Sequence, residues 1–162
     1  MIFVVIGAND PASVGPGVGS GVVTAVVSGT GLGNFDITLV NGSWNITYLF
    51  TGFFQPVDNL PTRNSVKAGQ AIPVKFSLNG NHSLAIFAAG YPASGTFPCS
   101  GGAEDQIEET VTAGQSSLTY DASSGRYHYV WKTEKSWANS CRRLVVKLND
   151  GTLHYAEFAF KK

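Results

Sequence analysis

Short runs of alternating apolar and polar residues, separated by glycine-containing turns, constrain this chain more than any other sequence feature. Residues 72–78, for example, alternate directly after the turn at 68–70. A period of two places every second side chain on one face of a strand, and no segment carries a sustained helical period. The regular spacing of such runs in the C-terminal part predicts seven or eight strands and therefore an all-β, antiparallel β-sandwich.

Several of these strands are predicted individually. Residues 117–121 and 126–132 flank a turn at 122–125, whereas the runs at 84–88 and 107–112 are shorter. Pro73 interrupts the run at 72–78. Because proline has no N–H to donate to a sheet ladder, we expect its amide position to face a sheet edge or a bulge.

The dipeptide Asn41-Gly42 predicts a β-hairpin over residues 35–50. Both residues tolerate the positive φ angles of a type I′ turn, which pairs Val40 with Ser43. That register gives the hairpin one apolar face, which consists of Phe35, Ile37, Leu39, Trp44, Ile46 and Tyr48.

The last hairpin allows two registers. A two-residue loop at Asp150-Gly151 is one alternative. A three-residue loop at 149–151, with Gly151 in the left-handed conformation, is the other. We favour the three-residue loop because it sets Arg143 directly across from Glu157, a favourable pair of opposite charges. This register pairs Leu148 with Thr152, Val146 with His154 and Leu144 with Ala156.

The first 54 residues form a strand-rich region that is too small for a substantial core of its own. Residues 1–6 and 22–27 are apolar on both strand faces, and a glycine-rich stretch separates them. We expect this region to dock on the sandwich or to belong to a neighbouring domain. A third interpretation is strand exchange with another subunit, for which the candidates are Ile2, Phe3, Val4, Val5 and Ile6.

Composition excludes several function classes. The net charge is zero: residues 1–62 carry about −3 and the remainder about +3, so no basic face suited to nucleic acid is expected. No apolar stretch is long enough to span a bilayer. The apolar segment 1–8 lacks the basic region of a signal peptide, so we interpret the chain as a piece of a longer protein.

Cys99 and Cys141 are the two cysteines. An even count without metal-like spacing predicts one disulfide, and two free buried thiols are the alternative. In the chain-entropy model, closing the loop between these cysteines would stabilise the fold by about 4 kcal/mol. We expect the disulfide to connect the two layers of the sandwich and to indicate an oxidising, extracellular compartment.

Catalysis and cofactor binding have little support. The sequence lacks the common nucleophile, phosphate-loop and metal-protease motifs, so we expect no enzyme activity, no cofactor and no metal. His82, His128 and His154 are dispersed, and His154 is predicted to face inward in a structural role. The acidic residues Glu104, Asp105, Glu108 and Glu109 are predicted to be a solvated edge rather than a calcium site.

Four aromatic residues have two competing interpretations. Tyr127, Tyr129 and Trp131 lie on one strand face, and Trp137 follows in the next loop. Such a row forms half of a sandwich core in most proteins, but it can also stack on sugars. The four residues are therefore candidates for a polysaccharide-binding surface, with Trp137 the most exposed.

Part of the chain resembles a known family. The motif Ile72-Pro73-Val74-Lys75-Phe76 and the segments 86–92, 108–114, 129–133 and 141–160 are similar to the bacterial PxKF domain. The resemblance covers residues 51–162. It implies an immunoglobulin-like module near the C-terminal end of long secreted or surface proteins, with a cysteine at both positions found here and no assigned chemistry.

From these observations we expect a strand-rich region over residues 1–54 and an immunoglobulin-like sandwich over residues 55–162. The expected function is a non-catalytic structural or adhesive module, a disulfide-stabilised spacer or cap in an extracellular or cell-surface bacterial protein. Its partners would be neighbouring domains or other surface proteins. A carbohydrate-binding module and a fibre subunit assembled through the N-terminal strand are the alternatives.

Overall fold

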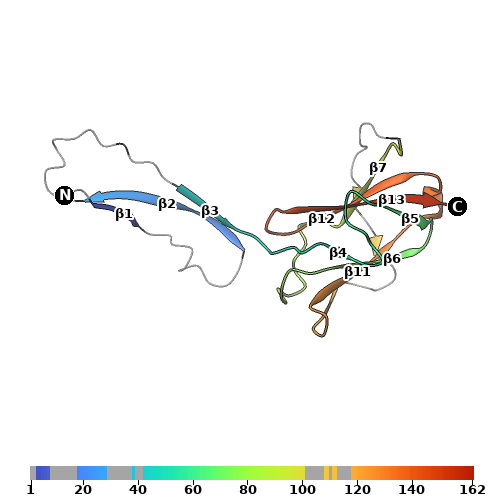
Figure 1. The fold of residues 1–162 in the computed structure, drawn as a ribbon, viewed down its shortest axis with the longest axis horizontal. Coiled ribbons are helices and arrows are strands. Elements are labelled where there is room, and N and C mark those ends of the chain that lie inside the picture. The colour runs from blue at the N-terminus through green and yellow to red at the C-terminus, as the bar shows by residue number, and fades with distance from the viewer. Residues whose placement is uncertain are drawn as a thin grey trace. The chain divides into compact units, whose positions relative to one another are not determined.

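The structure is a computed structural model, and it describes residues 3–7, 18–28, 38, 42–100, 108–109, 111–112 and 118–162. The chain divides into two compact units, Met1–Thr47 and Tyr48–Lys162. The regular structure in the described residues is β-strand, apart from one 3₁₀ turn at Lys135–Trp137 (Figure 1). The predicted all-β class is therefore confirmed.

The first unit contains one antiparallel sheet with the strand order β1-β2-β3. Its strands are β1 (Phe3–Gly7), β2 (Gly19–Ser28) and β3 (Gly42–Ile46). Gly42, predicted as a turn residue, lies within β3 opposite Val23 of β2. The predicted partner arm at 35–40 lies outside the described residues, except for Thr38.

The second unit consists of two sheets. One has the order β10-β11-β6-β4, with β9 also paired to β11, and the other has the order β5-β13-β12-β7-β8. Their strands are β4 (Phe53–Phe54), β5 (Arg63–Lys67), β6 (Ala71–Phe76), β7 (Ala93–Phe97), β8 (Glu108–Glu109), β9 (Val111–Thr112), β10 (Thr119–Asp121), β11 (Arg126–Lys132), β12 (Cys141–Lys147) and β13 (Leu153–Lys161).

This strand order is that of an immunoglobulin-like sandwich, in which the chain crosses several times between two packed sheets. The chain contributes β4 to one sheet, crosses to the other as β5, and returns as β6. The β5–β13 pair is parallel, whereas the other paired strands described are antiparallel. The sandwich is thus mixed rather than purely antiparallel as predicted.

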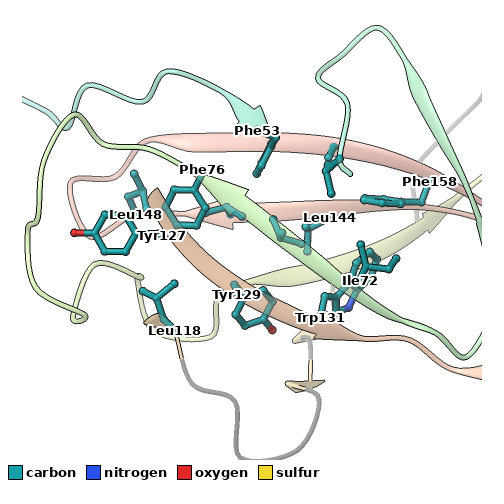
Figure 2. Packing of buried hydrophobic residues seen from close by; sticks show 14 of the residues in the cluster. Phe53, Ile72, Phe76, Leu118, Tyr127, Tyr129, Trp131, Leu144, Leu148 and Phe158 are labelled. Atoms are coloured by element: carbon teal, nitrogen blue, oxygen red, sulfur yellow. The ribbon is translucent and has the colours of Figure 1, made fainter. Parts of the chain in front are cut away.

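The core lies between the two sheets (Figure 2). Alternation in β6 and β11 directs every second side chain inward, as the sequence predicts. Burying each large apolar side chain stabilises the fold by about 1.5–3 kcal/mol. The largest fully buried side chains are Trp131, Tyr127, Phe76, Phe158, Leu78, Ile86, Leu144, Leu148, Val57, Val74, Val145 and Val146.

The last hairpin adopts the three-residue loop. Val146 lies opposite His154, and Arg143 lies opposite Glu157. The Leu148 N–H donates to the Thr152 carbonyl over 3.0 Å, and Gly151 has φ +88°. The favoured register is confirmed, and the left-handed conformation explains why glycine occupies position 151.

Pro73 has β11 on one side, opposite Val130, while β4 pairs only with the β6 residues Lys75 and Phe76. The other side of Pro73 therefore has no strand partner in the described part of the chain, in agreement with the predicted edge position.

Two boundaries differ from the predictions. Residues 84–88 are not a strand: Phe87 makes an isolated bridge to Leu148, and the Asn149 side chain donates to the Ala85 carbonyl. This segment runs irregularly along the last hairpin, which satisfies its backbone without a ladder. The second unit also begins before Gln55, because Tyr48 and Phe50 already pack against its core.

Candidate functional site

The row of aromatic residues on β11 faces the core. The exposed fractions of Tyr127, Tyr129 and Trp131 are 0%, 3% and 0%. Their rings pack against neighbours from other strands; Tyr127, for example, stacks on Phe76 with ring centroids 5.4 Å apart. The hypothesis that these three residues stack on a ligand is therefore wrong, because the alternation along β11 places all three side chains in the core.

Trp137 is half-buried at the end of the 3₁₀ turn. The Arg142 guanidinium lies over its ring at 4.0 Å from the centroid, and Trp131 and Phe160 contact it from the core side at 5.7 and 5.5 Å. These neighbours occupy much of its surface. Trp137 is thus an extension of the core, and sugar binding by this residue stays a prediction.

The disulfide between Cys99 and Cys141 is confirmed, but it lies elsewhere in the fold than expected. Cys141 begins β12 and lies opposite Phe97, the last residue of β7. The bridge therefore joins two neighbouring strands at the end of one sheet, and the prediction that it connects the two layers is wrong. Cys99 follows Pro98 just beyond the end of β7, and this is what brings it beside Cys141.

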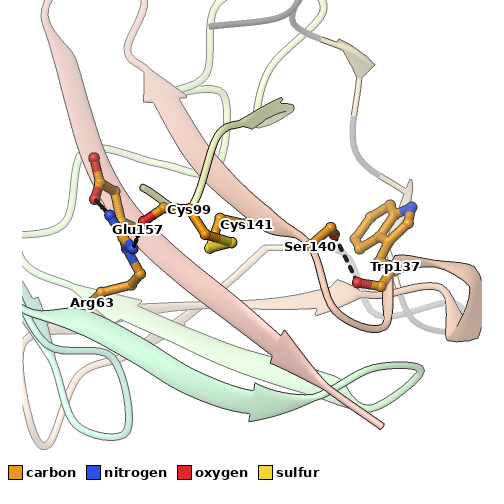
Figure 3. Close-up of a disulfide and its surroundings, with 6 residues drawn as sticks. All are labelled: Arg63, Cys99, Trp137, Ser140, Cys141 and Glu157. Carbon is orange, nitrogen blue, oxygen red and sulfur yellow. Dashed lines mark hydrogen bonds and ion pairs between the residues drawn. A yellow bond between two sulfur atoms is a disulfide. The ribbon is translucent and has the colours of Figure 1, made fainter. Parts of the chain in front are cut away.

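An ion-pair network lies beside the disulfide, and Figure 3 shows Arg63 and Glu157 of this network. Arg63 of β5 donates from Nη1 to the Cys99 carbonyl over 2.8 Å, and its Nη2 lies 3.6 Å from Glu157 of β13. Arg143 of β12 donates from Nη2 to the same carboxylate over 2.6 Å. We call Arg63, Cys99, Cys141, Arg143 and Glu157 the cystine corner; it ties β5, β13, β12 and the end of β7 together.

Asn64 fixes β5 from its opposite face. This residue is only 6% exposed, and its Nδ2 donates to the carbonyls of Asp58 and Glu157, both over 3.1 Å. Its Oδ1 accepts from the Asp58 N–H over 2.8 Å. One buried amide thus joins β5 to β13 and to the loop before β5, because each of its polar atoms is satisfied.

A second cluster anchors the segment through which the chain enters the second unit. The Tyr48 N–H donates to Asp150 Oδ2 over 2.7 Å, and Thr152 donates from N and Oγ1 to Oδ1 over 2.9 and 2.7 Å. The Phe50 ring stacks on His154, with centroids 3.6 Å apart and planes 9° from parallel. We call Tyr48, Phe50, Asp150, Thr152 and His154 the linker latch.

Asp150 and His154 of the linker latch both have lowered pKa values. Burial lowers the pKa of His154, and the nearby Asp150 carboxylate only partly opposes this effect. Burial by itself raises the pKa of Asp150, but the hydrogen bonds from Thr152 and Tyr48 outweigh it, so the pKa lies below its usual value. The latch is therefore built around a neutral imidazole and an ionised carboxylate.

His154 has the structural role that the sequence predicts: its Nε2 lies 3.1 Å from Thr152 Oγ1. His82, on the segment after β6, packs its ring against Tyr48 with centroids 4.9 Å apart, whereas His128 lies on β11. Among the residues that the structure describes, no group of three or more His, Cys, Asp or Glu could hold a metal ion. Glu104 and Asp105 lie outside those residues, while Glu108 and Glu109 form β8.

The predicted strand-exchange residues occupy the first sheet. Residues 3–6 belong to β1 and pair with residues 25–28 of β2, whereas Ile2 lies outside the described residues. In the described part of the chain, no helix is long and apolar enough to cross a membrane.

Comparison of the sequence with models of protein families finds no match, and comparisons with curated proteins and with solved structures find no significant match. Both clusters hold strands and chain segments in place. The sequence indicated Arg143 with Glu157, but Arg63, Asn64, Tyr48 and Phe50 were missed because their partners are distant in the chain.

Proposed function

We propose that this chain is a non-catalytic structural module of an extracellular or cell-surface bacterial protein, in which the second unit acts as a disulfide-stabilised spacer. The bacterial origin and the surface location rest on the resemblance of residues 51–162 to the PxKF domain. The spacer role rests on how the polar and covalent contacts of the second unit are used.

The cystine corner is the observation that carries the proposal. Its disulfide, two arginines and one carboxylate bind strand to strand and to the Cys99 backbone. Glu157 is 14% exposed and is shared between both arginines, so its charge is already neutralised within the fold. Such an arrangement favours rigidity of the module, and a disulfide persists in oxidising compartments.

The compartment and the redox state of the cysteines test this proposal. Protein recovered from the producing cells is treated with a thiol-alkylating reagent before and after reduction, and the mass is measured. We expect the protein outside the cytosol, with both cysteines blocked until reduction. Recovery of reduced protein from the cytosol would remove the spacer proposal.

A second candidate function, assembly by strand addition, is favoured by the position of β1. This strand lies at one edge of the sheet β1-β2-β3, so one of its sides has no strand partner among the described residues. Such an edge can template pairing with another chain. Light scattering of the intact chain and of a chain lacking residues 1–9 tests this; the same oligomeric state for both would eliminate it.

A further inference from the structure

The first strand of one sheet and the last strand of the chain form the parallel pair β5–β13. Arg63 lies opposite Glu157 and Lys67 opposite Lys161, so five residues of each strand are paired. A parallel ladder has evenly spaced hydrogen bonds. A pull on the start of β5 and on the end of β13 acts in opposite directions along the ladder. It loads all of these bonds in parallel, whereas a pull across the strands would open them one after another.

The chain reaches and leaves the second unit along this same axis. The Tyr48 N–H is bonded to Asp150 in the turn just before β13, and the chain leaves the sandwich at Lys161, the other end of β13. Figure 1 shows this turn and the C-terminus at opposite ends of the unit. At about 3.3 Å per residue, β13 spans roughly 30 Å between these points. Tension on the chain is therefore directed along β13.

The residues around β5 strengthen the attachment against such a pull. Arg63 and Asn64 bind the first half of β5 to Glu157, while the Ala68 N–H donates to the Lys161 carbonyl over 2.9 Å. By contrast, β4 is paired through only two residues, Phe53 and Phe54. The segment before β5 therefore detaches before β5 does, and the β5–β13 ladder forms the main barrier.

We propose that the second unit resists tension along the chain, with the parallel β5–β13 pair as the mechanical clamp and the Cys99–Cys141 disulfide as the limit on extension. This inference deepens the proposed spacer function and rests on it for its biological meaning. Both strands of the clamp lie outside the loop that the disulfide closes, so the disulfide does not hold the clamp shut. Instead, once the clamp has broken, the disulfide keeps the 42-residue span between the two cysteines from extending.

Single-molecule constant-force unfolding of the full chain tests the clamp. The handles are attached at Thr47 and Lys162, two exposed residues that place the second unit alone under tension. Forced unfolding reports the unfolding rate. The slope of the logarithm of this rate against force gives the distance by which the unit extends to reach its transition state. We expect this distance to be about 3 Å, one residue's rise along a strand. A distance of more than about 10 Å would mean that several residues separate one after another, and it would overturn the clamp.

A matched pair of proline variants examines the ladder itself. Ala68 donates to β13, so the alternation along β5 directs the Val66 N–H toward β13 and the Ser65 N–H away from it. Val66→Pro removes one ladder bond and should raise the unfolding rate at constant force by about 5-fold. Ser65→Pro should change it by less than about 2-fold. Equal rates for the two variants would contradict the proposal.

Circular dichroism shows whether each variant folds. If Val66→Pro fails to fold, the force dependence of the wild-type chain still decides the matter, because it requires no substitution.

The disulfide is tested by repeating the measurement under reducing conditions. Releasing 42 more residues should lengthen the unfolding step by about 140 Å, with little change in the rate at which the clamp breaks. An unchanged step length would overturn the extension limit, and a large increase in rate would show that the disulfide is part of the clamp. These measurements use purified oxidised protein, so failure of the clamp leaves the spacer proposal standing. A cytosolic, reduced protein would remove the spacer role without altering the mechanical result.

Discussion

The two ends of the second unit are fastened in different ways. At the cystine corner a covalent bond and a shared carboxylate join strands of one sheet. At the linker latch a hydrogen bond from the Tyr48 N–H to the Asp150 carboxylate and the stacking of Phe50 on His154 hold the chain where it enters. The first kind of attachment responds to reduction of its disulfide. The second responds to protonation, because the pKa values of Asp150 and His154 are shifted.

Removing the disulfide should have the largest effect on stability. Replacing both Cys99 and Cys141 by alanine should lower the free energy of unfolding by about 4 kcal/mol, since the loop is no longer closed in the unfolded chain. Urea titration of the variant beside the oxidised wild type measures this loss. Hydrogen exchange should quicken in β7 and at the start of β12 before it does in the linker latch. A loss below about 1 kcal/mol would mean that other interactions supply most of the free energy of unfolding.

Phe50→Ala should have the next largest effect. This change removes the stacking on His154 and Phe76 and leaves a half-filled space, which should cost about 2 kcal/mol. Leu49→Ala is the matched control, because Leu49 is 61% exposed. Hydrogen exchange should quicken around residues 48–54 in the first variant only; equal stability of the two variants would show that the latch contributes little.

Acidification should weaken the linker latch in particular. The pKa of His154 lies below its usual 6.5 in the folded chain, so the unfolded chain binds this proton more readily. The stability that His154 contributes is complete above about pH 6.5 and is lost as the pH falls below that value. Urea unfolding at pH 7.5 and 5.0 should show a larger loss for wild type than for His154→Phe, which keeps a ring against Phe50. Identical losses would mean that His154 is not the titrating group.

Arg63→Met should have the smallest effect on equilibrium stability. The Arg63 side chain is 34% exposed, so its ion pair with Glu157 should contribute at most about 1 kcal/mol. The loss should shrink further in concentrated salt, which screens exposed charges. Denaturant unfolding at low and high salt measures both quantities; a loss of several kcal/mol would indicate that the Cys99 contact carries more than the ion pair does.

Local chemistry explains what could be predicted from the sequence. The loop at 149–151 was predicted correctly because a glycine in the left-handed conformation and an opposite-charge pair, Arg143 with Glu157, select the same register. The inward face of β11 followed from simple alternation. Both signals lie within a few residues of the structure that they specify, so no knowledge of the remaining fold was needed.

Pairings between distant segments explain most of what was missed. β7 consists largely of small residues without alternation, and its place beside β12 depends on the whole sheet. The parallel pairing of β5 with β13 leaves no local sign in either strand. The disulfide was predicted as a bond but assigned to the wrong place, because a count of cysteines does not tell which strands are neighbours.

The crossing of the chain from β4 to β5 and back to β6 has a practical consequence for anyone who excises this module. A gene fragment starting at Gln55 would keep the residues of β5 but discard Tyr48, Phe50 and Phe53, whose rings cover one rim of the interior. Such a fragment should expose apolar core residues to solvent and therefore aggregate during purification. A fragment that begins at Tyr48 or earlier keeps these three aromatic rings, which close this side of the core between the two sheets.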